Sequence, residues 1–171
     1  MERRQHPRHN EDNRVAPERA KLEARVAAHP FLLGMSDSHV RLLADCALAS
    51  YFGAGRVIFR EGEMANRFYL IEHGKVALES STLGEAVRIE EIQDGDLLGW
   101  SWLFPPYAWH FTARAVEETT AIFFYGTILR EYCEKDHTLG FELFKRMSVV
   151  MLRRLQAARQ KLLSVSQSGR S

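Results

Sequence analysis

The spacing of apolar residues divides the chain into a helical lead-in, a strand-rich middle and a helical end. In the lead-in, Leu22, Val26 and several alanines recur at helical spacing, and the pattern stops before Pro30. Pro17 suits a first helical turn, so we expect the first helix to begin there.

A second, shorter helix is predicted after Ser36 or Asp37, because either side chain can cap a helix N-terminus. Its buried face is formed by apolar residues at helical spacing, namely Val40, Leu42, Leu43 and Cys46. The helical lead-in is therefore expected to cover residues 17–47.

From about residue 48 to 125 the pattern changes to short β-rich runs separated by glycine. The runs cover 57–59, 68–71, 76–78, 87–89 and 120–124. The glycines between them are Gly55, Gly62, Gly74, Gly84 and Gly95. Glycine at such corners permits positive φ or a close approach of the backbone. An antiparallel sandwich or barrel is typical of this pattern.

After Gly126 the helical spacing returns, first over 128–133 and then from about 139 to 163. The long stretch has one apolar stripe, formed by Phe144, Met147, Met151, Leu155, Ala158 and Leu162. Residues 1–16 are predicted to be a disordered tail and 164–171 a polar tail. The sequence thus predicts one domain over 17–163, with strands over 48–125 and C-terminal helices over 126–163.

Composition supports one compact domain and offers no global electrostatic partner. The 171 residues are 46% hydrophobic and 26% charged, which suffices for one core. Because the formal net charge is +1, charged partners have to be sought in local patches. No apolar run approaches the roughly 20 residues that span a bilayer, and no signal peptide is recognised. We therefore expect a cytoplasmic protein without membrane contact, and Cys46 and Cys133 suit structural thiols there.

The sequence lacks patterns of catalysis and metal binding. The seven histidines show no ligand spacing, so no metal is expected. Ser101 has no Gly-x-Ser-x-Gly elbow around it, and neither a phosphate-loop lysine motif nor a carboxylate pair stands out. We expect no enzyme activity, no catalytic residue and no resident cofactor.

The most specific pattern of the chain is at residues 51–78, which read YFGAGRVIFREGEMANRFYLIEHGKVAL. A glycine turn, a Gly-Glu turn and an aromatic strand ending in Gly-Lys-Val follow one another. With the flanking helices, this pattern resembles the cyclic-nucleotide-binding domain of catabolite-activator-type regulators and cAMP-dependent kinase regulatory subunits. The matching positions are Gly55, Gly62, Glu63, Tyr69, Ile71, Gly74 and Val76. The resemblance covers roughly 31–163 and implies a mainly β fold with flanking helices: a β-roll (double-stranded jelly roll) and a long C-terminal helix.

The resemblance also places a phosphate-binding cassette at residues 99–115, GWSWLFPPYAWHFTARA. In the family, helix N-terminal N–H groups hold the phosphate, an arginine neutralises it, and a glutamate accepts from the ribose hydroxyl. Here Trp100 stands at the glutamate position and Trp109 at the arginine position. Losing such an arginine costs about 2 to 5 kcal/mol, so we do not expect cyclic-nucleotide binding in the usual way. The ligand residues that the resemblance implies are Gly99, Trp100, Ser101, Trp102, Leu103, Trp109 and His110.

Three functions stay open. The aromatic residues concentrated between 100 and 111 either fill the vacated pocket or stack on a flat or apolar ligand. We interpret the chain first as a non-enzymatic sensor or regulatory module with a divergent pocket and a small-molecule effector of unknown identity. The alternatives are a structural or assembly module with an aromatic-filled pocket, and a true cAMP or cGMP sensor that signals through its C-terminal helix.

The long helix resembles the dimerisation helix of the family. The positions predicted to form a homodimer are Phe144, Met147, Met151, Leu155 and Leu162, the alternative being that this helix folds back on its own roll. Family regulators carry a helix-turn-helix domain after this helix, whereas only 164–171 follow here. We therefore expect no specific DNA binding by this chain alone, and the sequence does not name the protein partner.

Overall fold

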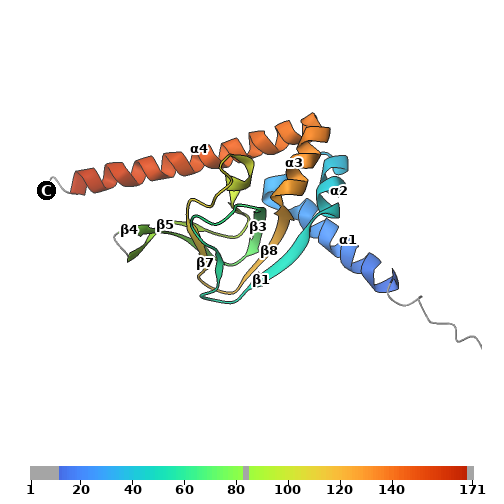
Figure 1. Cartoon of the computed structure of the whole chain (residues 1–171), viewed down its shortest axis with the longest axis horizontal. Helices are drawn as coiled ribbons and strands as arrows, with labels where there is room; N and C mark the ends of the chain where they lie inside the picture. The colour runs from blue at the N-terminus through green and yellow to red at the C-terminus, as the bar shows by residue number, and fades with distance from the viewer. Residues whose placement is uncertain (1–11, 83–84, 169–171) are drawn as a thin grey trace, which may run out of the picture. The chain divides into compact units, whose positions relative to one another are not determined.

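The computed structural model describes residues 12–82 and 85–168, and the chain divides between Leu129 and Arg130 into two compact units. Within the described part of the first unit, eight strands form two four-stranded antiparallel sheets (Figure 1). The strand order is β1-β8-β3-β6 in one sheet and β2-β7-β4-β5 in the other. The chain therefore has the β-roll with flanking helices that the sequence predicts.

The strands are β1 Leu48–Phe52, β2 Val57–Phe59, β3 Arg67–His73, β4 Val76–Thr82, β5 Glu85–Ile92, β6 Leu97–Leu98, β7 Thr112–Ala115 and β8 Thr119–Tyr125. All five predicted strand runs lie within observed strands. Three further strands, β1, β6 and β7, have no predicted run in the apolar pattern, although the cassette that the resemblance implies ends in a strand where β7 lies. β6 has only two residues, and β7 contains no large apolar side chain, so their local patterns are weak.

The lead-in forms helix α1 Asp12–Ala28, the 3-10 turn η1 Pro30–Leu32 and helix α2 Asp37–Asp45. The predicted cap of the second helix is confirmed, since the Ser36 side chain accepts a hydrogen bond from the N–H of His39. The first helix begins before Pro17, the predicted start. A proline inside a helix removes one hydrogen bond and crowds the carbonyl four residues earlier, which is why the sequence favoured Pro17 as the start. Residues 12–16 of the predicted tail are thus helical, and residues 1–11 lie outside the described part.

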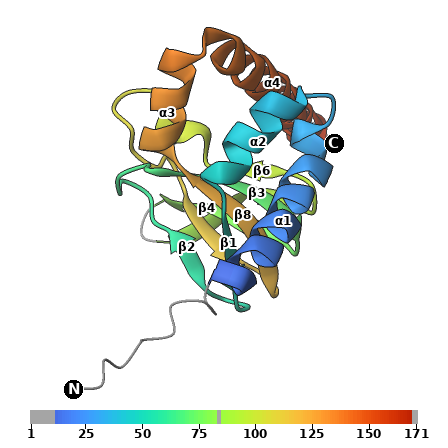
Figure 2. The same cartoon turned by 90° about the vertical axis from the view of Figure 1, so that its right-hand side faces the viewer.

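The lead-in helices lie along the outer face of the β1-β8-β3-β6 sheet (Figures 1 and 2). The rings of Phe31 and Phe68 meet edge to face at 5.6 Å, and Arg25 donates to both carboxylate oxygens of Glu72. The inner faces of the two sheets enclose a separate core. Its buried members are Phe59, Ala65, Tyr69, Ile71, Val76, Leu78, Ile92, Leu98, Trp109, Ala113 and Ala121.

Helix α3 spans Gly126–Lys135, and helix α4 spans His137–Ser168. Helix α4 runs past residue 163, so residues 164–168 of the predicted polar tail are helical. No glycine or proline interrupts it there, and the Ser164 hydroxyl donates to the carbonyl of Lys161 within the helix. Residues 169–171 lie outside the described part. None of the described helices combines the length and apolar character needed to cross a membrane.

Candidate ligand pocket

The predicted cassette consists of a glycine, a short helix, a loop and a strand. Gly99 follows β6 with a left-handed backbone (φ 87°), and the 3-10 helix η2 then occupies Trp100–Leu103. After the loop, β7 begins at Thr112. A Cβ atom at position 99 would lie 2.8 Å from the ring of Trp109. Both the backbone conformation and this ring therefore require glycine.

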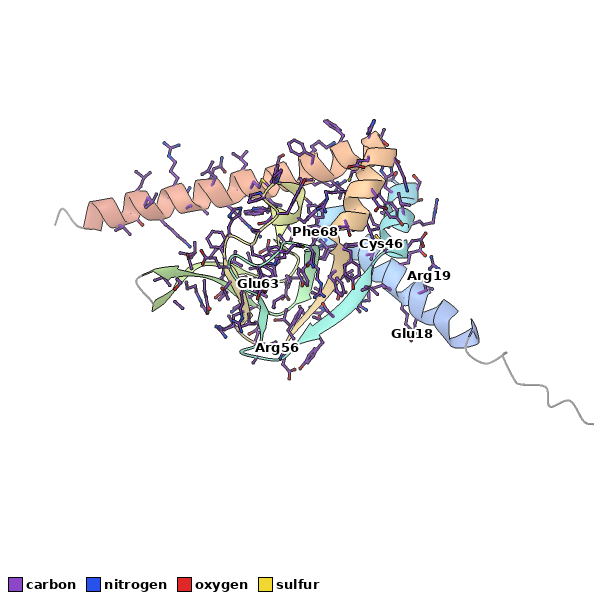
Figure 3. All side chains as sticks on the ribbon, in the orientation of Figure 1. Glu18, Arg19, Cys46, Arg56, Glu63 and Phe68 are labelled. Atoms are coloured by element: carbon purple, nitrogen blue, oxygen red, sulfur yellow. The ribbon has the colours of Figure 1, made fainter. Side chains whose placement is uncertain are left out.

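Trp109 points into the core between the two sheets. Its side chain is 5% exposed and lies flat on Phe59, with ring centroids 3.8 Å apart and an interplanar angle of 11°. The loop before β3 holds its backbone: the Trp109 N–H donates to the carbonyl of Glu63, labelled in Figure 3, and its carbonyl accepts from Gly62. An uncharged ring thus occupies the interior where the sequence resemblance places an arginine.

Trp102 lies on the outer side of the β1-β8-β3-β6 sheet. It is fully buried and packs on Phe68, with centroids 6.0 Å apart, and Phe68 also contacts Phe31 and Phe124 (Figure 3 labels Phe68). Gly126 approaches so closely that a Cβ there would lie 2.8 Å from the Trp102 Cβ. Trp102 and Trp109 therefore belong to different cores and do not form one aromatic box.

The other predicted ligand residues differ in exposure. Ser101 is buried, Trp100 and Leu103 are half-buried, and His110 is exposed. The structure therefore distributes the predicted set between the interior, the outer side of the sheet and the surface.

Arg67 is a charged residue at the inner face that the sequence reasoning missed. Along β3 it alternates with Tyr69 and Ile71, and its guanidinium carbon lies 5.1 Å from the ring centroid of Phe123 and 5.9 Å from that of Tyr125. Its buried Nε has no hydrogen-bond partner among the described residues. Burial raises the pKa of Tyr69, and the neighbouring Arg67 opposes that shift. The signal in the sequence was strand parity, because residues 67, 69 and 71 share one face.

Arg114, the arginine of the cassette strand, is engaged away from the interior. Its Nε lies 3.2 Å from both carboxylate oxygens of Glu79, and its Nη1 donates to the carbonyl of Gly55. The adjacent Ala113 and Ala115 are fully buried, so strand alternation turns Arg114 outward.

The remaining side-chain chemistry concerns metal ligands and thiols. Within residues 12–82 and 85–168, no group of three or more His, Cys, Asp and Glu side chains could hold a metal ion. Both cysteines are free, and burial raises the pKa of Cys46 to about 11 and also raises that of Cys133. A raised thiol pKa suppresses the thiolate that nucleophilic chemistry needs.

Comparison with known proteins agrees with this fold. A family model described as "Cyclic nucleotide-binding domain" matches residues 49–136. Comparison with curated proteins gives no match. Among solved structures, a candidate cyclic nucleotide-binding protein from Geobacter metallireducens GS-15 is 27% identical, with a TM-score of 0.71. The alignment covers 78% of this chain and 97% of that one.

Two regulatory subunits of cAMP-independent protein kinase A share the fold at lower identity. A mutant from Trypanosoma brucei, bound to cAMP in its A site, is 22% identical, with a TM-score of 0.70 and coverage of 86% of this chain and 53% of that one. The subunit from Trypanosoma cruzi, bound to guanosine, is 20% identical, with a TM-score of 0.68 and coverage of 91% and 52%. Since the family model spans just over half of the 171 residues, the chain belongs to the cyclic nucleotide-binding domain family.

Proposed function

We propose that this chain is a non-catalytic regulatory module whose β-roll interior is filled by Trp109 and does not hold a cyclic phosphate in the family manner. The observation that carries the proposal is the stacking of Trp109 on Phe59 at 3.8 Å, with the same indole against Gly99. An indole has no positive charge to neutralise a phosphate, whereas guanidinium forms charge-assisted hydrogen bonds to it.

The expected loss of affinity follows from that missing charge. A buried anion without its arginine loses about 2 to 5 kcal/mol, which is roughly thirtyfold to a few thousandfold in Kd. Trp100 also offers no carboxylate to accept from a ribose hydroxyl. Cyclic-nucleotide binding at ordinary cellular concentrations is therefore not part of the proposed function.

Calorimetric titration of the full chain with cAMP, cGMP, AMP and guanosine tests the proposal. We expect no saturable heat with the cyclic nucleotides up to about 1 mM. Guanosine is included because the Trypanosoma cruzi neighbour carries it. Saturable binding of cAMP but not AMP by the unmodified chain would overturn the proposal.

A matched variant makes a negative result informative. The double substitution Trp100→Glu/Trp109→Arg restores both family side chains, and we expect it to gain cAMP binding. The cAMP-bound Trypanosoma brucei mutant is a precedent, because one of its three substitutions introduces an arginine. A cooperative thermal transition by circular dichroism would verify that the variant is folded before it is titrated.

A second candidate function, a sensor of a negatively charged ligand, is favoured by Arg67 alone. Its Nε is buried without a hydrogen-bond partner among the described residues, and a buried polar donor without a partner is costly unless a ligand satisfies it. In this function, Arg67→Gln abolishes any saturable response in the same titrations. Arg114→Gln, which removes an arginine held by Glu79, leaves that response unchanged.

The structural or assembly role shares the filled interior with the first proposal. The two differ in regulation: an assembly module binds its partner equally with and without ligand, whereas a regulatory module binds its partner differently when an effector is present. Pull-down of interacting proteins from the source cell, with and without each ligand, separates these outcomes.

A further inference from the structure

Helix α4 carries two apolar faces. Leu139, Leu143, Met147 and Val150 are at most 8% exposed. A second set of large apolar side chains is 51% to 73% exposed, and we call it the exposed face: Phe141, Phe144, Val149, Leu152, Leu155, Leu162 and Leu163. At 3.6 residues per turn, these positions lie along one side of the helix, opposite the buried set.

The residues predicted to form a homodimer are divided between these faces. Phe144, Leu155 and Leu162 belong to the exposed face, Met147 is buried, and Met151 is half-buried. The homodimer itself stays a prediction. The exposed face is the large apolar surface of α4 that a partner can cover.

The N-terminal half of the exposed face is hollowed to fit another helix. A hollow of about 350 Å³ is lined by Phe141, Phe144, Lys145, Ser148, Val149 and Leu152. The first four lie at positions i, i+3, i+4 and i+7, the spacing that receives one side chain of a facing helix in a coiled coil. The last four repeat that spacing one turn later. A helix with two apolar side chains one turn apart therefore fits this surface.

The charges on α4 indicate what kind of partner helix can bind to it. Its one acidic residue is Glu142, which already forms ion pairs with Lys145 and Arg146. Every later charged residue in the helix is basic, and the exposed Arg153 and Arg159 lie beside and on the exposed face, respectively. A partner with carboxylates beside its apolar stripe complements this surface.

A parallel second copy of this chain is a poorer fit. Arg159 follows Phe141 by 18 residues, which is five full turns, so it lies in the middle of the exposed face. In a symmetric parallel pair, each residue at the centre of the interface faces its own copy, so two Arg159 side chains would meet. Like charges that face one another are destabilising, and no acidic residue later in α4 offsets them.

We propose that the exposed face of α4 docks an amphipathic helix of another protein that carries Asp or Glu beside its apolar stripe. Apolar side chains of the partner enter the hollow, and its carboxylates pair with Arg153 and Arg159. This binding uses α4 alone and does not depend on whether the roll holds a ligand.

Fluorescence anisotropy of labelled peptides added to the full chain tests the proposal. The probe is a helical peptide of about four heptads with Leu at the a and d positions and Glu at e and g. One control peptide carries Lys at e and g, and another has the acidic composition in scrambled order. We expect saturable binding of the acidic heptad peptide only, weakened by added salt.

Two single substitutions localise the binding site. Leu152→Asp puts a carboxylate into the hollow and is expected to weaken binding about tenfold or more. Val165→Asp adds the same charge at a position that is 71% exposed on the other side of the helix, and it should leave Kd unchanged. Both variants are expected to keep the helicity and thermal transition of the unmodified chain.

Four results would overturn the proposal. The acidic heptad peptide fails to bind up to about 100 µM, or the scrambled peptide binds as well as it does. Light scattering gives a dimer mass that Leu152→Asp converts to a monomer, so that a second copy covers the face. The chain binds phosphatidylglycerol vesicles through Leu152 but does not bind the peptide, so that a lipid surface is the partner.

Discussion

The ring of Trp109 lies parallel to that of Phe59, 3.8 Å away, although 50 residues separate the two in the chain. Trp109→Ala removes this contact from the core between the sheets. We expect a loss of about 3 to 5 kcal/mol in the free energy of unfolding, because large-to-small core substitutions leave a cavity. Urea denaturation measures the loss.

Met64→Ala serves as the control for that measurement. Met64 lies next to Glu63, which pairs with the Trp109 backbone, but its side chain is 73% exposed. The control should stay within about 0.5 kcal/mol of the unmodified chain. Equal effects of the two substitutions would show that Trp109 does not contribute to the core as described.

Gly99→Ala should destabilise the roll more than Gly34→Ala. Both glycines have positive φ, but a Cβ at Gly34 meets no atom within 4 Å, whereas a Cβ at Gly99 meets the Trp109 ring at 2.8 Å. Gly34→Ala reports the backbone cost alone, about 1 kcal/mol. The excess at Gly99 is the steric cost of the ring.

A double substitution checks this attribution to the ring. Trp109→Phe shortens the side chain, so Gly99→Ala should cost less in the Trp109→Phe background than in the unmodified chain. If the two changes are additive in urea denaturation, the Gly99 effect does not arise from the Trp109 contact.

The accuracy of the sequence predictions depended on how locally each element is encoded. β3 and β8 carry consecutive large apolar residues, so their runs are recognisable without knowledge of their neighbours. β7 reads Thr-Ala-Arg-Ala and becomes a strand because β2 and β4 pair with it on both sides. Long-range pairing of this kind leaves no pattern in the strand itself.

The residues of the candidate site also differ in how far the sequence predicts their placement. Position in the cassette identified Trp109, and its burial follows from the apolar character of indole. The sequence did not indicate that Trp102, seven residues earlier, would pack on Phe68 on the other side of the sheet. Arg67 was missed because strand parity places it at the interior only once the inner face of β3 is known.

Alkylation of Cys46 should be slow in the folded protein. Burial raises the pKa of its thiol to about 11, so at about pH 8 its thiolate is on the order of a hundredfold less abundant than that of an ordinary thiol. In the Cys133→Ser variant, iodoacetamide should modify Cys46 at least about that much more slowly in the native state than in urea. Equal rates in the two states, measured by mass spectrometry, would contradict the burial of this thiol.

His29 should make the first unit less stable as the pH falls. Its Nδ1 accepts from the N–H of Phe31, and its Nε2 lies 3.0 Å from the carbonyl of Ile71, an arrangement that suits a neutral ring with the proton on Nε2. Burial lowers the pKa of His29, and Glu72 and Asp96 only partly oppose that shift. Protonation therefore places a second N–H against the Phe31 N–H in a buried site.

The sign of the pH dependence follows from that lowered pKa. Between the folded pKa and the ordinary value near 6.5, the unfolded chain binds more protons than the folded one, so stability increases with pH. The His29 contribution is complete above about pH 6.5 and is lost as the pH falls through the folded pKa. His29→Gln should flatten the unfolding free energy between about pH 7 and about pH 5 relative to the unmodified chain. His73→Gln, at a side chain that is 82% exposed, should leave the slope as it was, and an equal slope in both variants would exclude His29 as its source.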